Sequence, residues 1–239
     1  LNKIKKFNHF YVIYNNSNNR INSLFRFKKK KIKFIFEDLC NINCFKPIGH
    51  KIDVVLHLAS ITNAEASIND KKRVYNNNFN SFKNIVYFAK KNNSKFIHIS
   101  STSVYGSQDE IIGENCKELR PQSPYANVKL LEEKYLRKTK NISYISLRFG
   151  TIVGCSMGMR FHTAVNKFCF NAIFNLPITV WETAIDQFRP YLSIDDAFSS
   201  LKYVIEKKYF DNKIHNILSN NFTVRQILSF IKKFKKKVN

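Results

Sequence analysis

Apolar runs of strand length alternate with helical segments along the first 150 residues, and this order constrains the fold more than any other feature of the sequence. The runs cover residues 9–14, 32–36, 53–58, 95–99 and 141–149. Residues 53–58 are apolar almost throughout, which is typical of a strand buried on both faces of a sheet. The order predicts parallel βαβ units with right-handed crossovers, and therefore a doubly wound α/β domain.

The helices expected between and after these strands define two parts of the chain. Residues 74–91 and 125–138 have helical character, the first with its apolar side chains on one face and the second after a polar loop over residues 107–124. Beyond Gly150 the pattern is looser. There the sequence predicts helices over 160–174, 195–207 and 224–234, the last with Thr223 as its N-cap, and a short strand over 178–181. We therefore expect an α/β domain over residues 1–150 and a smaller lobe over residues 151–239.

Composition excludes several classes of protein. The net charge of +23 comes mainly from Lys, which is spread along the chain and not gathered with aromatic side chains, so we expect no specific nucleic-acid partner. No uncharged apolar stretch reaches about 18 residues, so we expect no membrane role. Five cysteines without a CxxC pair and six scattered histidines predict neither a disulfide framework nor a metal site. A cytoplasmic location fits these features.

The most informative local pattern joins Tyr125 and Lys129, which lie one helical turn apart and therefore share a face. An ammonium beside a phenol stabilises the phenolate and lowers a pKa that is ordinarily near 10, so the hydroxyl can exchange a proton near neutral pH. Ser101 follows the strand at 95–99 and can hydrogen-bond the same substrate oxygen. Alone, the Tyr–Lys spacing also fits the start of an ordinary amphipathic helix; the strand and polar segment before it favour a catalytic site.

With this context the chain resembles the extended short-chain dehydrogenase/reductase family, the NAD-dependent epimerase/dehydratase group. The matching segments are DVVLHLAS at 53–60, NFNSFKN at 78–84, SSTSVYG at 100–106, SPYANVK at 123–129, LRFGTIVG at 147–154 and QFRPYLSIDD at 187–196. They follow the family's order from about residue 9 to residue 230. The resemblance implies a Rossmann-like NAD-binding domain over residues 1–150 and a substrate-binding lobe over residues 151–239.

The resemblance also implies individual roles. Tyr125 would be the general acid/base, Lys129 would hold the nicotinamide ribose and lower the Tyr pKa, and Ser101 would orient the substrate hydroxyl. The cofactor NAD would contact Asn15, Asp38, Leu39, Ala59, Ser60, Asn78 and Lys129. A nucleotide-sugar substrate would contact Thr151, Arg160, Asn166 and Arg189, with the two guanidinium groups on its diphosphate. A surface ion pair for Arg189, and capping or packing roles for Arg160 and Asn166, are the alternatives. The resemblance also permits a homodimer.

The sequence departs from the family at the cofactor diphosphate. The family's Gly-rich turn is absent, because the first of the six glycines is Gly49. We therefore expect residues 1–8 to be the remnant of the family's first helix and the first strand of the sheet to be missing, which would leave its neighbours with open edges. Asn15 stands where the family often has an acidic residue for the adenosine ribose, so NAD and NADP are less sharply separated.

The reaction expected from these residues is simple oxidation and reduction at one sugar carbon. Dehydratases of the family usually carry acidic residues directly after the catalytic Ser or Thr, whereas this chain has Thr102 and Ser103. We therefore predict 4-epimerisation. Three alternatives remain open: an NAD(P)-dependent sugar-nucleotide reductase, a truncated or inactive relative that serves as a binding protein, and a basic nucleic-acid-binding protein.

Overall fold

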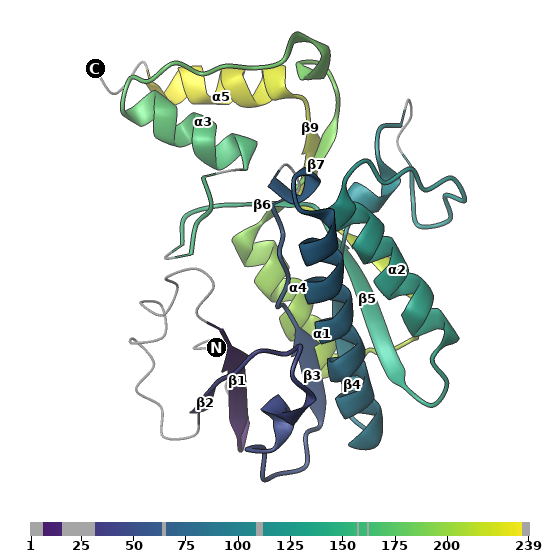
Figure 1. The fold of residues 1–239 in the computed structure, drawn as a ribbon. Helices are drawn as coiled ribbons and strands as arrows, with labels where there is room; N and C mark the ends of the chain where they lie inside the picture. Colours follow the sequence, from purple (N-terminus) through teal and green to yellow (C-terminus); the bar gives the residue numbers. More distant parts are fainter. Residues whose placement is uncertain are drawn as a thin grey trace. The chain divides into compact units, whose positions relative to one another are not determined.

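The computed structural model describes residues 7–15, 32–63, 66–108, 112–156, 158–161 and 163–235. Contacts along the chain divide it into two compact units (Figure 1). Unit 1 comprises Leu1–Arg148 and Lys202–His215, and unit 2 comprises Phe149–Leu201 and Asn216–Asn239. The predicted assignment of NAD binding to residues 1–150 and of substrate binding to residues 151–239 stays a prediction.

The first five strands lie where the apolar runs placed them, and a further strand near residue 215 joins them without such a run. β1 (Phe10–Tyr14) and β2 (Ile32–Phe36) form a two-stranded parallel sheet in which Phe10 lies opposite Ile32. A second sheet has the order β3-β4-β5-β8, with β3 parallel to β4. Its strands are β3 (Val54–His57), β4 (Lys95–Ser101), β5 (Ser143–Phe149) and β8 (Ile214–Ile217).

The two sheets of unit 1 are separate. Within the described residues β1 and β2 pair only with each other, and β3 pairs only with β4. β3 is therefore an edge strand although Val55 and His57 are both buried. The sheet has an open edge of the kind expected from the sequence, and the missing first strand itself stays a prediction.

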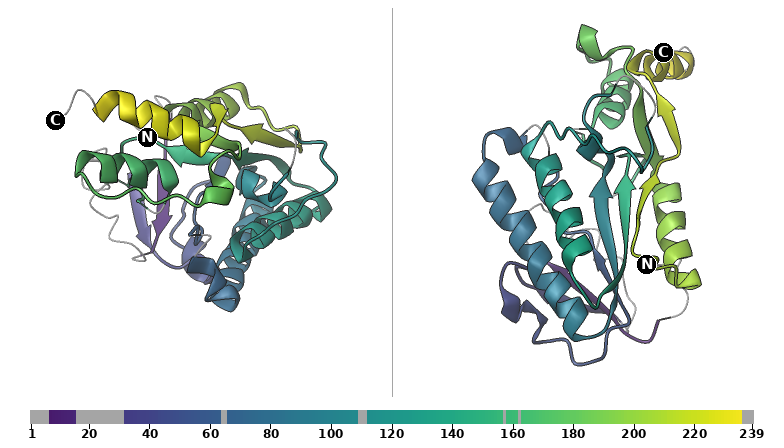
Figure 2. Two further views of the ribbon diagram at one scale, coloured as in Figure 1. Left: turned by 90° about the horizontal axis from the view of Figure 1, so that it is seen from above. Right: turned by 90° about the vertical axis from the view of Figure 1, so that its right-hand side faces the viewer.

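Two long helices pack on the second sheet. α1 (Lys71–Lys91) and α2 (Pro124–Lys138) contact each other, α1 lies against β3 and β4, and α2 lies against β4 (Figure 2). α1 begins three residues before the predicted start, because Asp70 accepts a hydrogen bond from the N–H of Arg73 and caps the helix. Ser123 caps α2 in the same way, and Pro124 suits the first turn because it has no N–H to satisfy.

The core of unit 1 fills the space between these helices and strands. Phe82 and Phe96 are fully buried, and Phe45 stacks on Phe88 with ring centroids 4.4 Å apart. Short 3-10 helices connect the regular elements: η2 (Ile42–Phe45), η3 (Ala66–Ile68) and η4 (Thr102–Tyr105). No helix among the described residues is both long and apolar enough to span a membrane.

Unit 2 contains a three-stranded sheet with the order β6-β7-β9. β6 (Thr151–Val153) is parallel to β7 (Arg189–Ser193), and β9 (Asn220–Phe222) is antiparallel to β7. Its helices are α3 (Ala164–Ile173), η5 (Glu182–Ala184) and α5 (Val224–Lys235), while α4 (Ile194–Lys207) begins in unit 2 and ends in unit 1. Phe168, Tyr191, Val224 and Ile227 form its buried core.

Unit 2 also corrects one element of the sequence interpretation. The strand predicted over residues 178–181 is absent, and that segment has no regular structure. The side chains do alternate, because Ile178 and Val180 pack on the core while Trp181 is 79% exposed, but no strand within the described residues pairs with this segment. The predicted cap of α5 is confirmed, because Thr223 Oγ1 accepts from the N–H of Gln226 and the Gln226 side chain accepts from the N–H of Thr223.

Candidate active site

Ser101 lies at the carboxyl end of β4, where the strand passes directly into η4. Its side-chain oxygen accepts a hydrogen bond from the backbone N–H of Ser103 at 3.2 Å and so caps η4. The side chain is half-buried. Ligands of open α/β sheets bind beyond the carboxyl ends of the strands, which is the edge that Ser101 occupies.

Gly106 closes the turn that follows η4. Its φ of 69° lies in the left-handed region, and a Cβ atom at this position would lie 1.9 Å from the carbonyl oxygen of Arg120. The backbone N–H of Arg120 donates to the carbonyl of Tyr105 at 3.3 Å. Only glycine permits this close approach, which holds the segment after Ser101 against the segment that leads into α2.

Tyr125 and Lys129 lie one turn apart at the start of α2, as their spacing predicts. The Ser123 cap fixes where the helix begins and therefore the direction in which both side chains point. Lys129 Nζ lies 5.9 Å from the centroid of the Tyr125 ring. Tyr125 is half-buried, whereas the Lys129 side chain is only 3% exposed.

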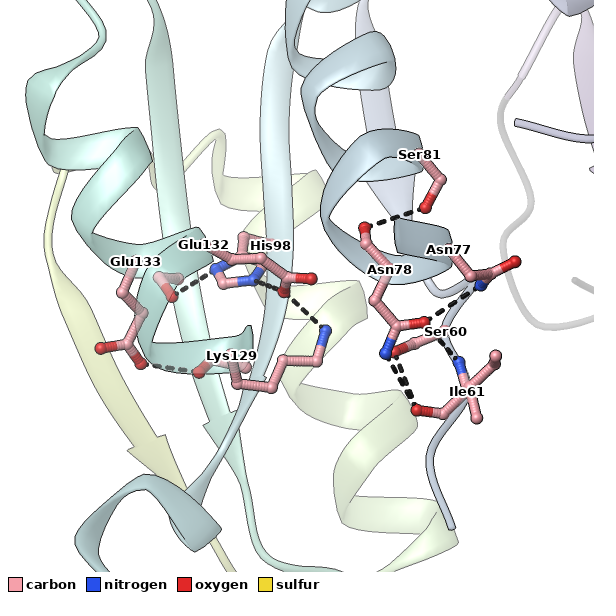
Figure 3. Close-up of polar contacts among 11 residues, drawn as sticks. Ser60, Ile61, Asn77, Asn78, Ser81, His98, Lys129, Glu132 and Glu133 are labelled. Carbon is pink, nitrogen blue, oxygen red and sulfur yellow. Dashed lines mark hydrogen bonds and ion pairs between the residues drawn. The ribbon is translucent and has the colours of Figure 1, made fainter. Parts of the chain in front are cut away.

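A buried chain of polar contacts extends from Lys129 into the sheet (Figure 3). Lys129 Nζ donates to Glu132 Oε2 at 2.8 Å, and the same oxygen lies 2.9 Å from His98 Nε2. His98 Nδ1 lies 2.8 Å from Ser146 Oγ. The chain therefore joins α2 to β4 and β5, and all four side chains are buried.

The charges of this chain follow from burial and from the contacts. Burial lowers the pKa of Lys129, but the Glu132 carboxylate and Tyr125 outweigh it and raise that pKa above the usual lysine value. Burial raises the pKa of Glu132, but Lys129 and His98 outweigh it and lower that pKa to about 2. Burial also lowers the pKa of His98, more than Glu132 raises it. The arrangement is an ammonium, a carboxylate and a neutral imidazole.

Glu133, the next residue of α2, forms a second buried network. Its Oε1 accepts from Ser100 Oγ at 2.6 Å and from Arg148 Nε at 2.8 Å, and its Oε2 accepts from Arg148 Nη2 at 2.7 Å. The Arg148 guanidinium lies over the ring of Tyr105, 4.7 Å from its centroid. Together with the contact to Ser100, the residue before Ser101, this bidentate pair fixes α2 against β4 and β5.

The sequence interpretation missed both glutamates and their partners. Glu132 and Glu133 follow Lys129 by three and four residues, so they lie on the same side of α2. That side also carries Val128 and Leu136, which are buried. Two adjacent acidic residues on the apolar face of a helix were the signal that could have revealed buried partners.

Among the expected cofactor residues, Asn78 is fully buried on α1 (Figure 3). Its Oδ1 accepts from the N–H of Ile61 at 2.8 Å, and its Nδ2 donates to the carbonyl of the same residue at 3.0 Å. The amide therefore holds the segment after β3 in the way that a neighbouring strand would. Asn78 fixes the backbone beside Ala59 and Ser60, and its predicted contact with the cofactor stays a prediction.

The other expected cofactor residues lie at or just beyond strand ends. Asn15 directly follows β1 and is exposed. Asp38, two residues beyond β2, is exposed and accepts from the N–H of Cys40 at 2.8 Å, while Leu39 is buried. Ala59 is exposed and Ser60 is half-buried in the segment that follows β3.

The four expected substrate residues all belong to unit 2. Thr151 begins β6, and Arg189 begins β7 with its guanidinium exposed and donating to Gln187 Oε1 at 2.8 Å. Asn166 is 8% exposed, donates to the carbonyl of Arg160 at 3.0 Å and accepts from the N–H of Gly154 at 3.4 Å. Asn166 therefore also shapes the backbone, and the substrate roles stay predictions.

We expect acid to weaken folding, because His57 stays neutral in the folded chain. His57 at the end of β3 is 2% exposed, and burial, assisted by Lys129, lowers its pKa to about 3. In the unfolded chain the histidine binds a proton near pH 6.5. The contribution of neutral His57 to the free energy of unfolding is therefore complete above that pH, and it is lost as the pH falls toward 3. At about pH 5 the expected loss from this histidine is about 2 kcal/mol.

Urea unfolding at about pH 7.5 and about pH 5 measures this loss. The variant His57→Phe fills the same site without a titrating group, so its free energy of unfolding should fall by about 2 kcal/mol less over the same interval. An identical pH dependence in the two proteins would show that His57 does not cause it.

No group of His, Cys, Asp or Glu within the described ranges is arranged to hold a metal ion. All five cysteines are free thiols.

Two comparisons by sequence point to one family. The sequence model of the NAD dependent epimerase/dehydratase family matches residues 8–217. The UDP-glucose 4-epimerase of Lactobacillus helveticus is 27% identical over 110 residues, which is 44% of this chain and 33% of that protein. The chain thus matches about a third of the length of this curated relative.

Two solved structures share the fold. The dTDP-glucose 4,6-dehydratase from Streptomyces venezuelae, solved with NAD bound, has a TM-score of 0.84 and 18% identity over 95% of this chain and 71% of that chain. The UDP-glucose 4-epimerase from Thermotoga maritima, solved with UDP-glucose, has a TM-score of 0.83 and 20% identity over 97% of this chain and 76% of that chain. The predicted Rossmann-like α/β fold is confirmed by this likeness, which concerns the fold alone.

Proposed function

This chain belongs to the NAD-dependent epimerase/dehydratase family, and on that premise we propose that it acts on a nucleotide sugar by 4-epimerisation. The observation that carries the proposal is the pairing of Tyr125 with a buried, charged Lys129 at the start of α2. Ser101 lies at the end of the strand against which this helix packs. A general acid/base, a cation that stabilises its anion and a hydroxyl that orients substrate are what carbinol oxidation requires.

NAD is the cofactor of the family, and the side chains of this chain fit part of the NAD molecule. An ammonium with three N–H donors suits the hydroxyls of the nicotinamide ribose, and Asp38 offers a carboxylate beyond β2 for the adenosine end. The diphosphate is not matched in the same way, because no glycine precedes Gly49. When bound, NAD supplies a hydride acceptor for the sugar carbon and a donor for its return.

The remaining steps concern the side chains of the chain itself. Ser101 Oγ hydrogen-bonds the reacting hydroxyl, and Tyr125 Oη accepts its proton as the C–H bond breaks. Lys129 stabilises the phenolate form of Tyr125 by charge. After the ketone has turned, Tyr125 returns the proton to the alkoxide that forms on the opposite face. Arg160 and Arg189 of unit 2 are proposed partners of the sugar-nucleotide diphosphate.

One observation supports a second candidate, a relative that binds without catalysis. β1 and β2 pair only with each other among the described residues. A split sheet of this kind weakens the platform on which the family places its cofactor. The two candidates differ in whether NAD binds and whether a sugar carbon is inverted.

The test is calorimetric titration of NAD followed by an NMR assay of epimerisation. We expect weak or undetectable NAD binding by residues 1–239 alone. Binding should become micromolar or tighter once a Gly-rich βα segment from a family member precedes residue 1. The extended protein should then interconvert UDP-glucose and UDP-galactose, or another pair of 4-epimers in a panel of nucleotide sugars. Failure of the extended protein to bind NAD would remove the enzyme proposal and leave the binding relative.

A further inference from the structure

The ammonium of Lys129 is in an environment that would neutralise an unpaired lysine. Its side chain is 3% exposed, and burial alone lowers its pKa. A neutral amine could not stabilise the Tyr125 phenolate by charge. Something must therefore keep Lys129 protonated, and the contact at 2.8 Å identifies the Glu132 carboxylate.

We propose that Glu132 is a positioning residue, which keeps the Lys129 ammonium charged beside Tyr125 and is itself held in place by His98 and Ser146. This inference rests on the proposed function, because it takes Lys129 as the cation that serves Tyr125. Glu132 need not touch substrate or cofactor, and it acts only through Lys129.

The contact with Glu132 uses one of the N–H donors of the Lys129 ammonium. An ammonium has three N–H donors, and Glu132 accepts one of them from the buried side of α2. Two donors can therefore serve groups on the Tyr125 side. Because the contact is an i to i+3 pair on one helix, the ammonium is held without any movement of the sheet.

His98 is suited to fix the carboxylate without adding charge. With His98 neutral, Nε2–H donates to Glu132 Oε2 and Nδ1 accepts from the Ser146 hydroxyl. A charged imidazole would compete with Lys129 for the same oxygen. Burial opposes that charge, because His98 is fully buried and its pKa is lowered.

The ionisable groups that act on Lys129 lie on three elements. Tyr125, Glu132 and Glu133 share α2 with it, His98 belongs to β4, and His57 belongs to β3. Both histidines stay neutral, since their pKa values are lowered. Glu133 is committed to Arg148, so Glu132 is the carboxylate available to Lys129.

A conservative variant separates charge from shape at this site. A single oxygen of Glu132 receives both contacts, while Glu132 Oε1 has no hydrogen-bond partner in the described part of the chain. In Glu132→Gln the amide oxygen can keep both hydrogen bonds and the amide nitrogen can take the Oε1 position. The variant thus removes the charge and preserves the shape. Glu133→Gln is the matched control, because it removes a carboxylate of equal burial from the adjacent position.

The experiment uses the purified chain without cofactor or sugar. NMR of 13C-labelled lysine, with the Lys129 signal assigned by its loss in Lys129→Met, measures the proton affinity of the ammonium. We expect Glu132→Gln to lower that affinity by more than about tenfold and Glu133→Gln to lower it much less. Phenolate absorbance, taken as the difference from the same protein carrying Tyr125→Phe, should appear at higher pH in Glu132→Gln than in the parent.

Each outcome decides the proposal. An unchanged proton affinity of Lys129, or a fall in that affinity with no change in the Tyr125 titration, would overturn it. If neither glutamine variant folds, the proton affinity of Lys129 in the parent decides. The proposal then requires that Lys129 remain protonated above the ordinary lysine range, and a Lys129 that does not would overturn it. A chain that shows both shifts but never inverts a sugar would refute the proposed function and retain the coupling. An active enzyme without the shifts would support the proposed function and refute the coupling.

Discussion

In a form of the protein that turns over substrate, Tyr125→Phe is expected to lower kcat by about 10²- to 10⁴-fold, because the variant removes the hydroxyl that we propose exchanges the proton. The ring stays in place, 5.9 Å from Lys129 Nζ in the parent, so the cation keeps its aromatic neighbour. Affinity for NAD should change by less than about twofold, since the hydroxyl acts on substrate. Steady-state kinetics and calorimetry measure the two quantities on the same sample.

Tyr135→Phe is the matched control for this prediction. Tyr135 lies on the same helix and packs its ring against Phe79 and Phe82, so it shares the element and the chemistry of Tyr125 without its position. Turnover in Tyr135→Phe should be that of the parent. Equal turnover in Tyr125→Phe and the parent would take the proton-transfer role from Tyr125.

Replacing Arg148 with Leu should lower the free energy of unfolding by about 3–5 kcal/mol, because the change leaves the buried Glu133 carboxylate without its counter-ion and with the Ser100 hydroxyl as its remaining donor. Both side chains of the pair are 3% exposed or less and are joined by two hydrogen bonds. Adding Glu133→Leu to this variant should restore much of the lost free energy of unfolding, because two apolar side chains leave no buried charge without a counter-ion. Urea unfolding of the single and double variants measures both effects.

The chain contains a pair of the same geometry in an exposed setting. Arg225 donates to both oxygens of Asp186 at 2.7 and 2.8 Å, but these side chains are 63% and 66% exposed. Arg225→Leu should therefore change the free energy of unfolding far less than Arg148→Leu does, because solvent screens an exposed pair. Similar losses from the two replacements would show that burial does not set the strength of these pairs.

The sequence predicted the elements whose pattern is local and strong. The strands of unit 1 were found because buried parallel strands are short, nearly continuous apolar runs, as in Val54–His57. α2 was found because residues 125–138 have helical character, although its cap Ser123 and its first residue Pro124 were assigned to the loop before it. By contrast, β8 and β9 are short, and polar residues such as His215 and Asn220 interrupt them. These strands exist because distant segments pair with them, and a local pattern does not contain that information.

The same distinction holds for the candidate site. The spacing of Tyr125 and Lys129 is a property of one helix, so it could be read from the sequence. The partner of Glu132 on β4 lies 34 residues away, and Ser146 lies 48 residues from His98. Such contacts depend on the register of β4 with its neighbours. The sequence therefore predicted that Tyr125 and Lys129 lie together at the start of α2 and missed the residues that hold Lys129.

The division of the chain into units has a consequence for any attempt to shorten the protein. Unit 1 is discontinuous, because Lys202–His215 returns to it after the chain has formed most of unit 2. That returning segment contains the end of α4 and the start of β8, and it hydrogen-bonds β5 through Lys213 and Asn212. A fragment that ends at residue 148 would thus lose the neighbour of its last strand and expose that edge to aggregation. A fragment that keeps unit 1 whole has to be made by joining Arg148 to Lys202 across unit 2, and no single cut can produce it.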